Sequence, residues 1–283
     1  MTAPASLHLE DFRPGRRFTS GSRTITADDI GAFTRLSGDA AAIHTDPAFA
    51  AAHGFPGPLA HGPFGVAVVF GLMHEMGIVG DTAIALLDLN WRFHAPLVAG
   101  DTVRFEMTVT RCRRASRGDA GVVNRHIRLV KDDGTAVSSG TTAFLVAARD
   151  PDGPPTHVTR DFAGPAWARL LAAKLTANRE FTDGTATFDG SIGFAAGQET
   201  VQVRVYRGRV LETGRWTPGG PTFTVGGDEL AWVELADAPR NDFIARSMRG
   251  AFHASGNTYE HLRLHKAIVA AWDSIRELAG EDA

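Results

Sequence analysis

Residues 62–77 read GPFGVAVVFGLMHEMG, and this stretch does most to indicate the fold. The run is apolar on nearly every face, and a helix without a polar stripe must be buried. Pro63 suits the first helical position, because its missing N–H would be unpaired there in any case. Gly77 suits the C-terminal cap. The stretch therefore predicts a buried helix over residues 63–76.

Segments in which apolar and polar residues alternate follow this helix. Such alternation is typical of strands, and Asp132-Asp133-Gly134 reads as a turn between the last two. Upstream, Thr26 resembles an N-cap, and the short amphipathic helix that it opens should end near Gly38. The first half is therefore expected to be α+β, with a buried helix followed by an antiparallel sheet. Its expected strands cover 83–93, 102–113, 122–131 and 136–147.

The composition changes at residues 148–156, where prolines, glycine and aspartates replace the alternating pattern. We interpret 148–159 as a linker between a first domain, 1–147, and a second, 160–283. The second domain also reads as α+β, with helices packed on a small antiparallel sheet. Its expected helices cover 162–175, 229–236, 242–248 and 259–279, and its expected strands cover 185–194, 200–206, 209–214 and 222–225.

The composition of the 283 residues, 43% apolar and 22% charged, is that of an ordinary globular protein with room for two cores. Its 29 basic and 32 acidic residues give a net charge of -3, which would not attract nucleic acid, so a small-molecule partner is expected. We find neither a targeting segment nor an apolar run near the roughly 18 to 20 residues that cross a bilayer. A cytoplasmic protein without membrane insertion is predicted. Cys112, the single cysteine, reads as a core residue.

Candidate site residues lie in the segment 37–47, SGDAAAIHTDP. Asp39 and His44 are five positions apart, which on a regular helix separates them by about 140°, so they can converge only on a bent loop. Gly38 and Pro47 both favour such a loop. A carboxylate beside an imidazole can handle the protons of a water molecule near neutral pH.

The start of the buried helix supplies a third group. N–H groups in the first turn of a helix lack partners within the helix and lie at the positive end of its dipole. The N–H of Gly62 can therefore hold an oxygen on which negative charge develops. Asp39, His44 and Gly62 form the candidate catalytic set, and His61 is expected to serve only as part of the helix cap.

The first half resembles the MaoC-like, R-specific enoyl-CoA hydratase family, in which a motif Gly-Asp-x-Asn-Pro-x-His precedes an Ala-His-Gly helix start. Gly38, Asp39 and His44 match the motif, and residues 60–62, AHG, match the helix start. Residues 93–101, FHAPLVAGD, also resemble the family, so the resemblance covers about residues 8–147.

This resemblance implies a hot-dog fold, in which an antiparallel sheet wraps around a central helix, and a homodimer. It also implies that Asp39 and His44 are the catalytic pair and that Gly62 is the oxyanion donor. The sequence departs from the motif at Ala41 and Ala42, where the family has Asn and Pro.

The second half is similar to SCP2-like lipid-carrier domains over about residues 160–279. The similarity rests on residues 188–192, FDGSI, on 221–225, PTFTV, and above all on 247–257, SMRGAFHASGN. It implies an α+β lipid-binding domain whose hydrophobic tunnel could hold the aliphatic part of an acyl chain.

Together the resemblances imply a hydro-lyase that reversibly hydrates a trans-2-enoyl thioester to the (3R)-3-hydroxyacyl thioester. The acyl thioester would be its small-molecule partner, and coenzyme A or a carrier protein would enter only as part of that substrate. Two alternatives stay open. One is an acyl or lipid binding protein without chemistry, which Ala41 and Ala42 motivate. The other is a dehydratase acting on a polyketide intermediate bound to an acyl carrier protein.

Two other residue groups have simpler interpretations. His44, Asp46 and His61 lack a standard zinc spacing, so no metal is expected, and neither is a separate cofactor. A cluster of arginines could meet the phosphates of coenzyme A, but a solvated strand end and loop is the favoured interpretation. These arginines are Arg111, Arg113, Arg114 and Arg117.

Overall fold

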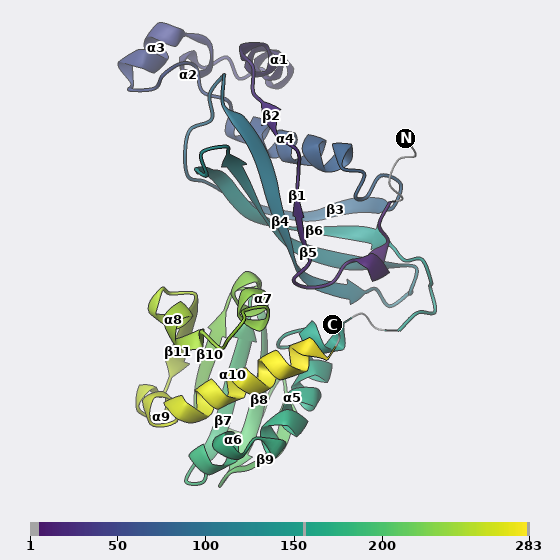
Figure 1. The fold of residues 1–283 in the computed structure, drawn as a ribbon, viewed down its shortest axis with the longest axis vertical. Helices are drawn as coiled ribbons and strands as arrows, with labels where there is room; N and C mark the ends of the chain where they lie inside the picture. The colour runs from purple at the N-terminus through teal and green to yellow at the C-terminus, as the bar shows by residue number, and fades with distance from the viewer. Residues whose placement is uncertain (1–5, 155–156, 282–283) are drawn as a thin grey trace. The chain divides into compact units, whose positions relative to one another are not determined.

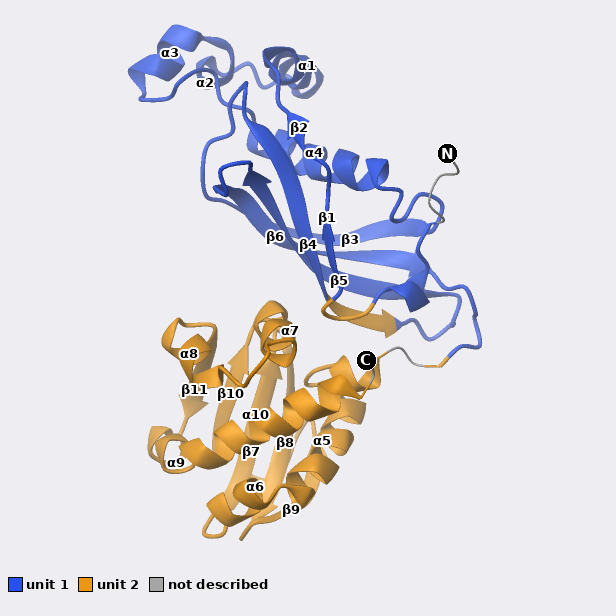
Figure 2. Ribbon diagram, viewed as in Figure 1, with its two compact units in different colours: residues 1–12, 16–109, 114–153 blue, residues 13–15, 110–113, 154–283 orange. Residues whose placement is uncertain are grey.

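The computed structural model describes residues 6–154 and 157–281, which group into two compact units (Figures 1 and 2). The first unit comprises 6–12, 16–109 and 114–153, and the second takes in 13–15, 110–113 and the described chain from 154 onward. Pro155 and Thr156, inside the predicted linker, lie outside the described residues.

The first unit contains the predicted elements and several short ones that the sequence analysis missed. All four expected strands are confirmed to within two residues at either end. The elements are η1 (Leu9–Asp11), β1 (Arg17–Thr19), β2 (Arg23–Thr24), α1 (Ala27–Ser37), α2 (Ala42–Thr45), α3 (Pro47–Ala52), α4 (Gly62–Glu75), β3 (Ala83–Phe93), β4 (Thr102–Arg114), β5 (Ala120–Lys131) and β6 (Ala136–Ala147).

These strands form one sheet in the order β1-β4-β5-β6-β3, with β2 also paired to β4. β6 pairs antiparallel with both β5 and β3. Helix α4 lies against the sheet (Figure 1) and buries a row of apolar side chains, whose loss from water stabilises the unit. This row comprises Phe64, Val68, Val69, Leu72 and Met73. A helix held by an antiparallel sheet is the expected hot-dog arrangement.

The prediction that α4 is buried on every face is wrong for one side of the helix. Pro63, Ala67 and His74, which are spaced to share a face, are exposed in the single chain. The edge strand β3 is also open to solvent despite its apolar sequence. Ile84, Leu86, Leu87, Leu89 and Phe93 are each more than 40% exposed. The first unit thus leaves an apolar helix face and an apolar strand uncovered.

The second unit is α+β, as predicted. Its elements are η2 (Val158–Arg160), α5 (Pro165–Ala177), α6 (Arg179–Gly184), β7 (Asp189–Ala196), β8 (Glu199–Tyr206), β9 (Arg209–Gly214), β10 (Phe223–Gly227), α7 (Glu229–Ala236), α8 (Phe243–Met248), β11 (Phe252–Gly256), α9 (Thr258–Arg263) and α10 (His265–Gly280). The five strands lie in the order β11-β10-β7-β8-β9, and α5 and α10 lie against their sheet (Figure 1).

Two expectations for the second unit are wrong. The sheet is mixed, because β10 pairs parallel with β7 while its other neighbour, β11, is antiparallel. The expected single terminal helix is two helices that meet at Leu264, and Leu262 on the first of them is exposed. The interior is filled by large aromatic side chains, including the fully buried Trp167, Trp232 and Trp272. None of the described helices is long and apolar enough to span a bilayer.

Candidate active site

The loop after α1 brings Asp39 and His44 together, as the sequence predicted. Helix α1 ends at Gly38, whose backbone adopts the left-handed conformation with φ 74° and donates its N–H to Thr34. The chain then bends through Asp39 into the single turn of α2, which carries His44. Asp46 closes the segment by capping α3, where its side chain accepts from the N–H groups of Ala48 and Phe49.

Asp39 and His44 face each other across a gap suited to a water molecule. Nε2 of His44 lies 3.8 Å from Oδ2 of Asp39, too far for a direct hydrogen bond but within reach of one shared water. Nδ1 of His44 lies 2.7 Å from the carbonyl oxygen of Leu59. Because a carbonyl only accepts, we assign the proton of neutral His44 to Nδ1, which leaves Nε2 as a base facing the carboxylate.

His61 is the site residue that the sequence analysis missed, since it was expected only to cap a helix. Its side chain is 3% exposed, and its Nε2 lies 2.8 Å from the carbonyl oxygen of Asp39, so Nε2–H donates. Its ring stacks on that of His44 with centroids 3.8 Å apart. His61 therefore fixes both members of the pair. The sequence signal that could have identified His61 as a site residue is its position directly before the predicted helix start.

Gly62 occupies the first position of α4, and its N–H donates to no described residue. A Cβ atom built here would lie 2.8 Å from Cζ of Phe93, so a larger residue would require this ring to shift. The free N–H lies at the positive end of the helix dipole, as the sequence predicted. This end of α4 can stabilise an oxyanion.

A cavity of about 620 Å³ opens beside these groups. Asp39 is absent from its wall and has a 57% exposed side chain, so the carboxylate reaches the site from the solvent side. Most of the wall is apolar, and the buried hydroxyl of Ser138 on it has no hydrogen-bond partner among the described residues. The wall comprises His44, Phe55, Leu59, Ala60, His61, Gly62, Pro63, Gly65, Phe93, His94, Ala95, Pro96, Leu97, Val137 and Ser138.

Asp39, His44 and His61 also meet the geometric requirement of a three-ligand cation site. One potential ligand atom from each lies within 4.8 Å of the other two. However, Nε2 of His61 already donates to the Asp39 carbonyl, and a nitrogen that carries a proton cannot bind a metal. The arrangement therefore fits acid–base chemistry better than a metal centre.

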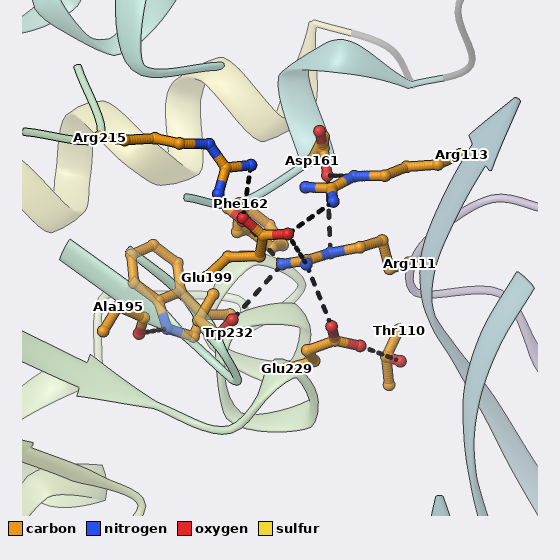
Figure 3. Close-up of polar contacts among 11 residues, drawn as sticks. Thr110, Arg111, Arg113, Asp161, Phe162, Ala195, Glu199, Arg215, Glu229 and Trp232 are labelled. Atoms are coloured by element: carbon orange, nitrogen blue, oxygen red, sulfur yellow. Dashed lines mark hydrogen bonds and ion pairs between the residues drawn. The ribbon is translucent and has the colours of Figure 1, made fainter. Parts of the chain in front are cut away.

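Arg117, in the loop after β4, is 85% exposed as expected, but the arginines of β4 itself are not a solvated strand end. Figure 3 shows Arg111 and Arg113 among acidic partners of the second unit. Nε of Arg113 lies 2.9 Å from Asp161 and its Nη1 2.8 Å from Glu199, while the buried Arg111 lies 3.3 Å from Glu229. These guanidinium groups are already paired with carboxylates, so they do not form a site for the phosphates of a ligand.

Sequence comparison relates the first half to known proteins. The family model described as "MaoC like domain" matches residues 11–128. The (R)-specific enoyl-CoA hydratase of Aeromonas caviae is 31% identical over 119 residues, which cover 42% of this chain and 84% of that protein. The 3-hydroxyacyl-thioester dehydratase Y of Mycobacterium tuberculosis is 34% identical over 136 residues, 46% of this chain and 44% of that protein.

Comparison of structures agrees with this relation. The structure of a putative MaoC domain protein dehydratase from Chloroflexus aurantiacus is 29% identical in sequence, with a TM-score of 0.51. The match covers 54% of this chain and 44% of that one. The chain spans less than two thirds of the length of several curated relatives, and only 32% of Protein MaoC from Klebsiella aerogenes.

Proposed function

Because this chain belongs to the MaoC-like family, whose members are hydro-lyases, we propose that it reversibly hydrates a trans-2-enoyl thioester to the (3R)-3-hydroxyacyl thioester. The observation that carries the proposal is the approach of Asp39 Oδ2 to His44 Nε2, 3.8 Å apart, beside the free N–H of Gly62 and an apolar cavity.

The three groups divide the chemistry of hydration among them. A water held between Asp39 and His44 gives up a proton to the pair as its oxygen bonds to C3 of the substrate. The electrons of the double bond move toward the thioester oxygen, which accepts a hydrogen bond from Gly62. The proton held by the pair is then delivered to C2. One water is consumed, and the apolar wall holds the acyl chain.

The departures at Ala41 and Ala42 leave the bent loop in place, which favours catalysis over the alternative of a binding protein without chemistry. The N–H of Ala41 lies 3.3 Å from Oδ1 of Asp39, so the backbone itself orients the carboxylate. His61 also restrains Asp39, because it donates a hydrogen bond to the Asp39 carbonyl oxygen.

The test is an assay with crotonyl-CoA and longer trans-2-enoyl-CoA substrates, in which hydration removes the absorbance of the conjugated thioester. Asp39→Asn and His44→Ala should each lower kcat about 100-fold to 10,000-fold, the usual effect of removing an acid–base group. The exposed His53→Gln is the matched control and should keep full activity.

No turnover at any chain length, or full turnover in both variants, would refute the proposal. Saturable binding of acyl-CoA without turnover would instead favour the binding protein. Turnover confined to substrates on an acyl carrier protein would favour the carrier-bound dehydratase.

We further propose that the protein forms a homodimer through β3 and the open face of α4. An edge strand has unpaired backbone groups, and this one also exposes apolar side chains such as Leu87 and Leu89. A second copy related by two-fold symmetry would cover the same surface on both chains. The exposed Pro63 and Ala67 on α4 extend that surface.

We propose that the protein is cytoplasmic.

We also propose that the second unit is an SCP2-like lipid carrier. This proposal rests on the motif resemblance and on a five-stranded sheet with helices against it. Trp167, Trp232 and Trp272 fill the interior, so a lipid entering it must displace aromatic rings. Titration with oleoyl-CoA should therefore shift tryptophan emission saturably, and an unchanged spectrum would count against a lipid carrier.

A further inference from the structure

Arg125 on β5 carries a charge that no acidic side chain of the described residues balances. The residue is 2% exposed. Its Nε donates to Thr142 Oγ1 at 2.6 Å and its Nη1 to Met73 Sδ at 2.9 Å, while the guanidinium carbon lies 3.9 Å from the centre of the Phe144 ring. All of these partners are neutral.

Burial of an unpaired charge is unfavourable, and proteins usually offset it with a carboxylate. No carboxylate of the described chain forms an ion pair with Arg125. Burial lowers the pKa of Arg125 to about 9, so the side chain still carries its proton at neutral pH. The guanidinium therefore remains a buried cation with hydrogen-bonding capacity to spare.

This cation contributes to the wall of a second cavity, of about 340 Å³. The remainder of the wall is mainly apolar, with aromatic rings from α4 and β6 and aliphatic side chains from β3. It comprises Phe70, Met73, His74, Val79, Gly80, Ala83, Ile84, Ala85, Leu86 and Phe144. A ligand matched to such a wall has one anionic group and an aliphatic body.

We propose that this cavity binds the carboxylate of an aliphatic chain, with the carboxylate on Arg125 and the chain against Phe70, Ile84 and Phe144. A guanidinium presents parallel N–H donors that match the two oxygens of a carboxylate. The aliphatic body gains from leaving water for the apolar wall.

The second cavity is separate from the candidate active site. The two share no lining residue, and they border different parts of α4, residues 62–65 in one and 70–74 in the other. At the rise of an α-helix, these parts lie roughly 13 Å apart along its axis. Binding at Arg125 can therefore be measured whether or not the protein proves to be a hydratase.

The same carboxylate chemistry has two sources, a free fatty acid or the far end of an acyl chain that is itself a thioester. Calorimetric titration of the full chain with octanoate tests the first source. Titration with octanedioyl-CoA, compared with octanoyl-CoA, tests the second. We expect at least one of the carboxylates to bind with an affinity at least tenfold above that of the matching compound without the carboxylate, 1-octanol or octanoyl-CoA.

Arg125→Met should weaken that binding at least tenfold. Arg128→Met, which removes an exposed arginine from the same strand, should leave it unchanged. A purely structural role predicts that Arg125→Met lowers the Tm. A ligand-binding role predicts that Arg125→Met without ligand has an equal or higher Tm, since a buried charge is removed. It also predicts that octanoate or octanedioyl-CoA raises the Tm of the parent protein but not that of the variant.

The proposal fails if neither carboxylate binds the parent protein, or if both bind Arg125→Met equally well. It also fails if Arg125→Met instead weakens self-association, because a carboxylate from a second copy would then be the partner of the guanidinium. If Arg125→Met lost hydratase activity but still bound the carboxylates, that result would also count against the proposal.

Discussion

At the scale of single residues, the site depends on proton positions that hydrogen bonds impose. Leu59 fixes the tautomer of His44, and His61 holds the Asp39 backbone from the other side. Neither partner acts on the substrate in the proposed reaction. Both determine where the acid and the base lie, and displacement of such groups by about 1 Å can cost about 100-fold in rate.

His61 should therefore behave as a positioning residue. We expect His61→Phe, which keeps a ring but loses the donor to Asp39, to lower kcat about tenfold to 100-fold with little change in KM. His61→Gln, whose amide can donate in place of Nε2, should recover part of the loss. Steady-state kinetics with crotonyl-CoA measure both. Equal kcat in His61→Phe and the parent protein would show that the contact has no catalytic role.

Glu10 predicts a pH dependence of stability. Partial burial of this carboxylate opposes its ionisation. Hydrogen bonds from the Arg149 N–H, the Arg114 side chain and the Asp150 N–H outweigh that effect and lower its pKa to about 2. A carboxyl whose pKa is lower in the folded state stabilises the fold above its unfolded pKa near 4.5, and this contribution is lost as the pH falls toward 2.

Glu10→Gln should therefore lower the free energy of unfolding by about 1 to 2 kcal/mol at pH 7, a value reduced for solvent screening of a partly exposed group. The difference from the parent protein should shrink between pH 4.5 and 2. Urea unfolding at several pH values measures it, with the exposed Glu75→Gln as control. A difference that does not change with pH would contradict the assigned cause.

At the scale of elements, α4 serves both fold and site. Its apolar side packs on the sheet, and its first N–H group remains free at the cavity. Substitutions at two of its glycines can test the two roles separately. At Gly62 an added Cβ meets the Phe93 ring, whereas at Gly71 it meets nothing within 4 Å.

Gly62→Ala should lower kcat by up to about 100-fold, because contact between the added methyl group and the Phe93 ring shifts the oxyanion donor, which alanine retains. Gly71→Ala, in the same helix, should leave kcat unchanged and raise the free energy of unfolding by about 0.5 to 1 kcal/mol, since alanine is the better helix former. Kinetics and urea unfolding of the two variants provide the comparison. Similar kcat values for both would contradict the predicted displacement of the Gly62 N–H.

At the scale of the whole molecule, the uncovered apolar strand β3 is the feature that a single chain does not explain. An edge strand of this length with exposed leucines on it promotes association unless charge or cover prevents it. The proposed dimer would bury it, and would also cover the open side of α4 next to the cavity. We therefore expect that a variant unable to form the dimer also has lower activity.

Leu87→Lys combined with Leu89→Lys should convert the dimer to a monomer and lower activity. Sedimentation velocity and light scattering measure the mass. Leu211→Lys, an exposed leucine on the edge strand β9 of the second sheet, is the matched control and should change neither property. A parent protein that is monomeric at micromolar concentration would refute the dimer.

The sequence by itself determined the four long strands of the first unit, α4 and the bent loop, because these follow from local rules. Alternation reveals a half-buried strand, and the spacing of Asp39 and His44 excludes a shared helix face. It also indicated Gly62 through the proline and glycine signals around α4. Each of these signals lies within about fifteen residues, and no long-range contact is needed to read it.

Only the tertiary structure decided the role of His61, the partners of Arg111 and Arg113, and the lack of a carboxylate partner for Arg125 among the described residues. His61 reads as a cap until folding places it 2.8 Å from Asp39, and Arg113 reads as a surface residue until Asp161 and Glu199 meet it. The parallel pairing of β10 with β7 was likewise hidden. Charge partners and strand neighbours depend on which distant segments meet, and that is set by packing of the whole chain and not by local pattern.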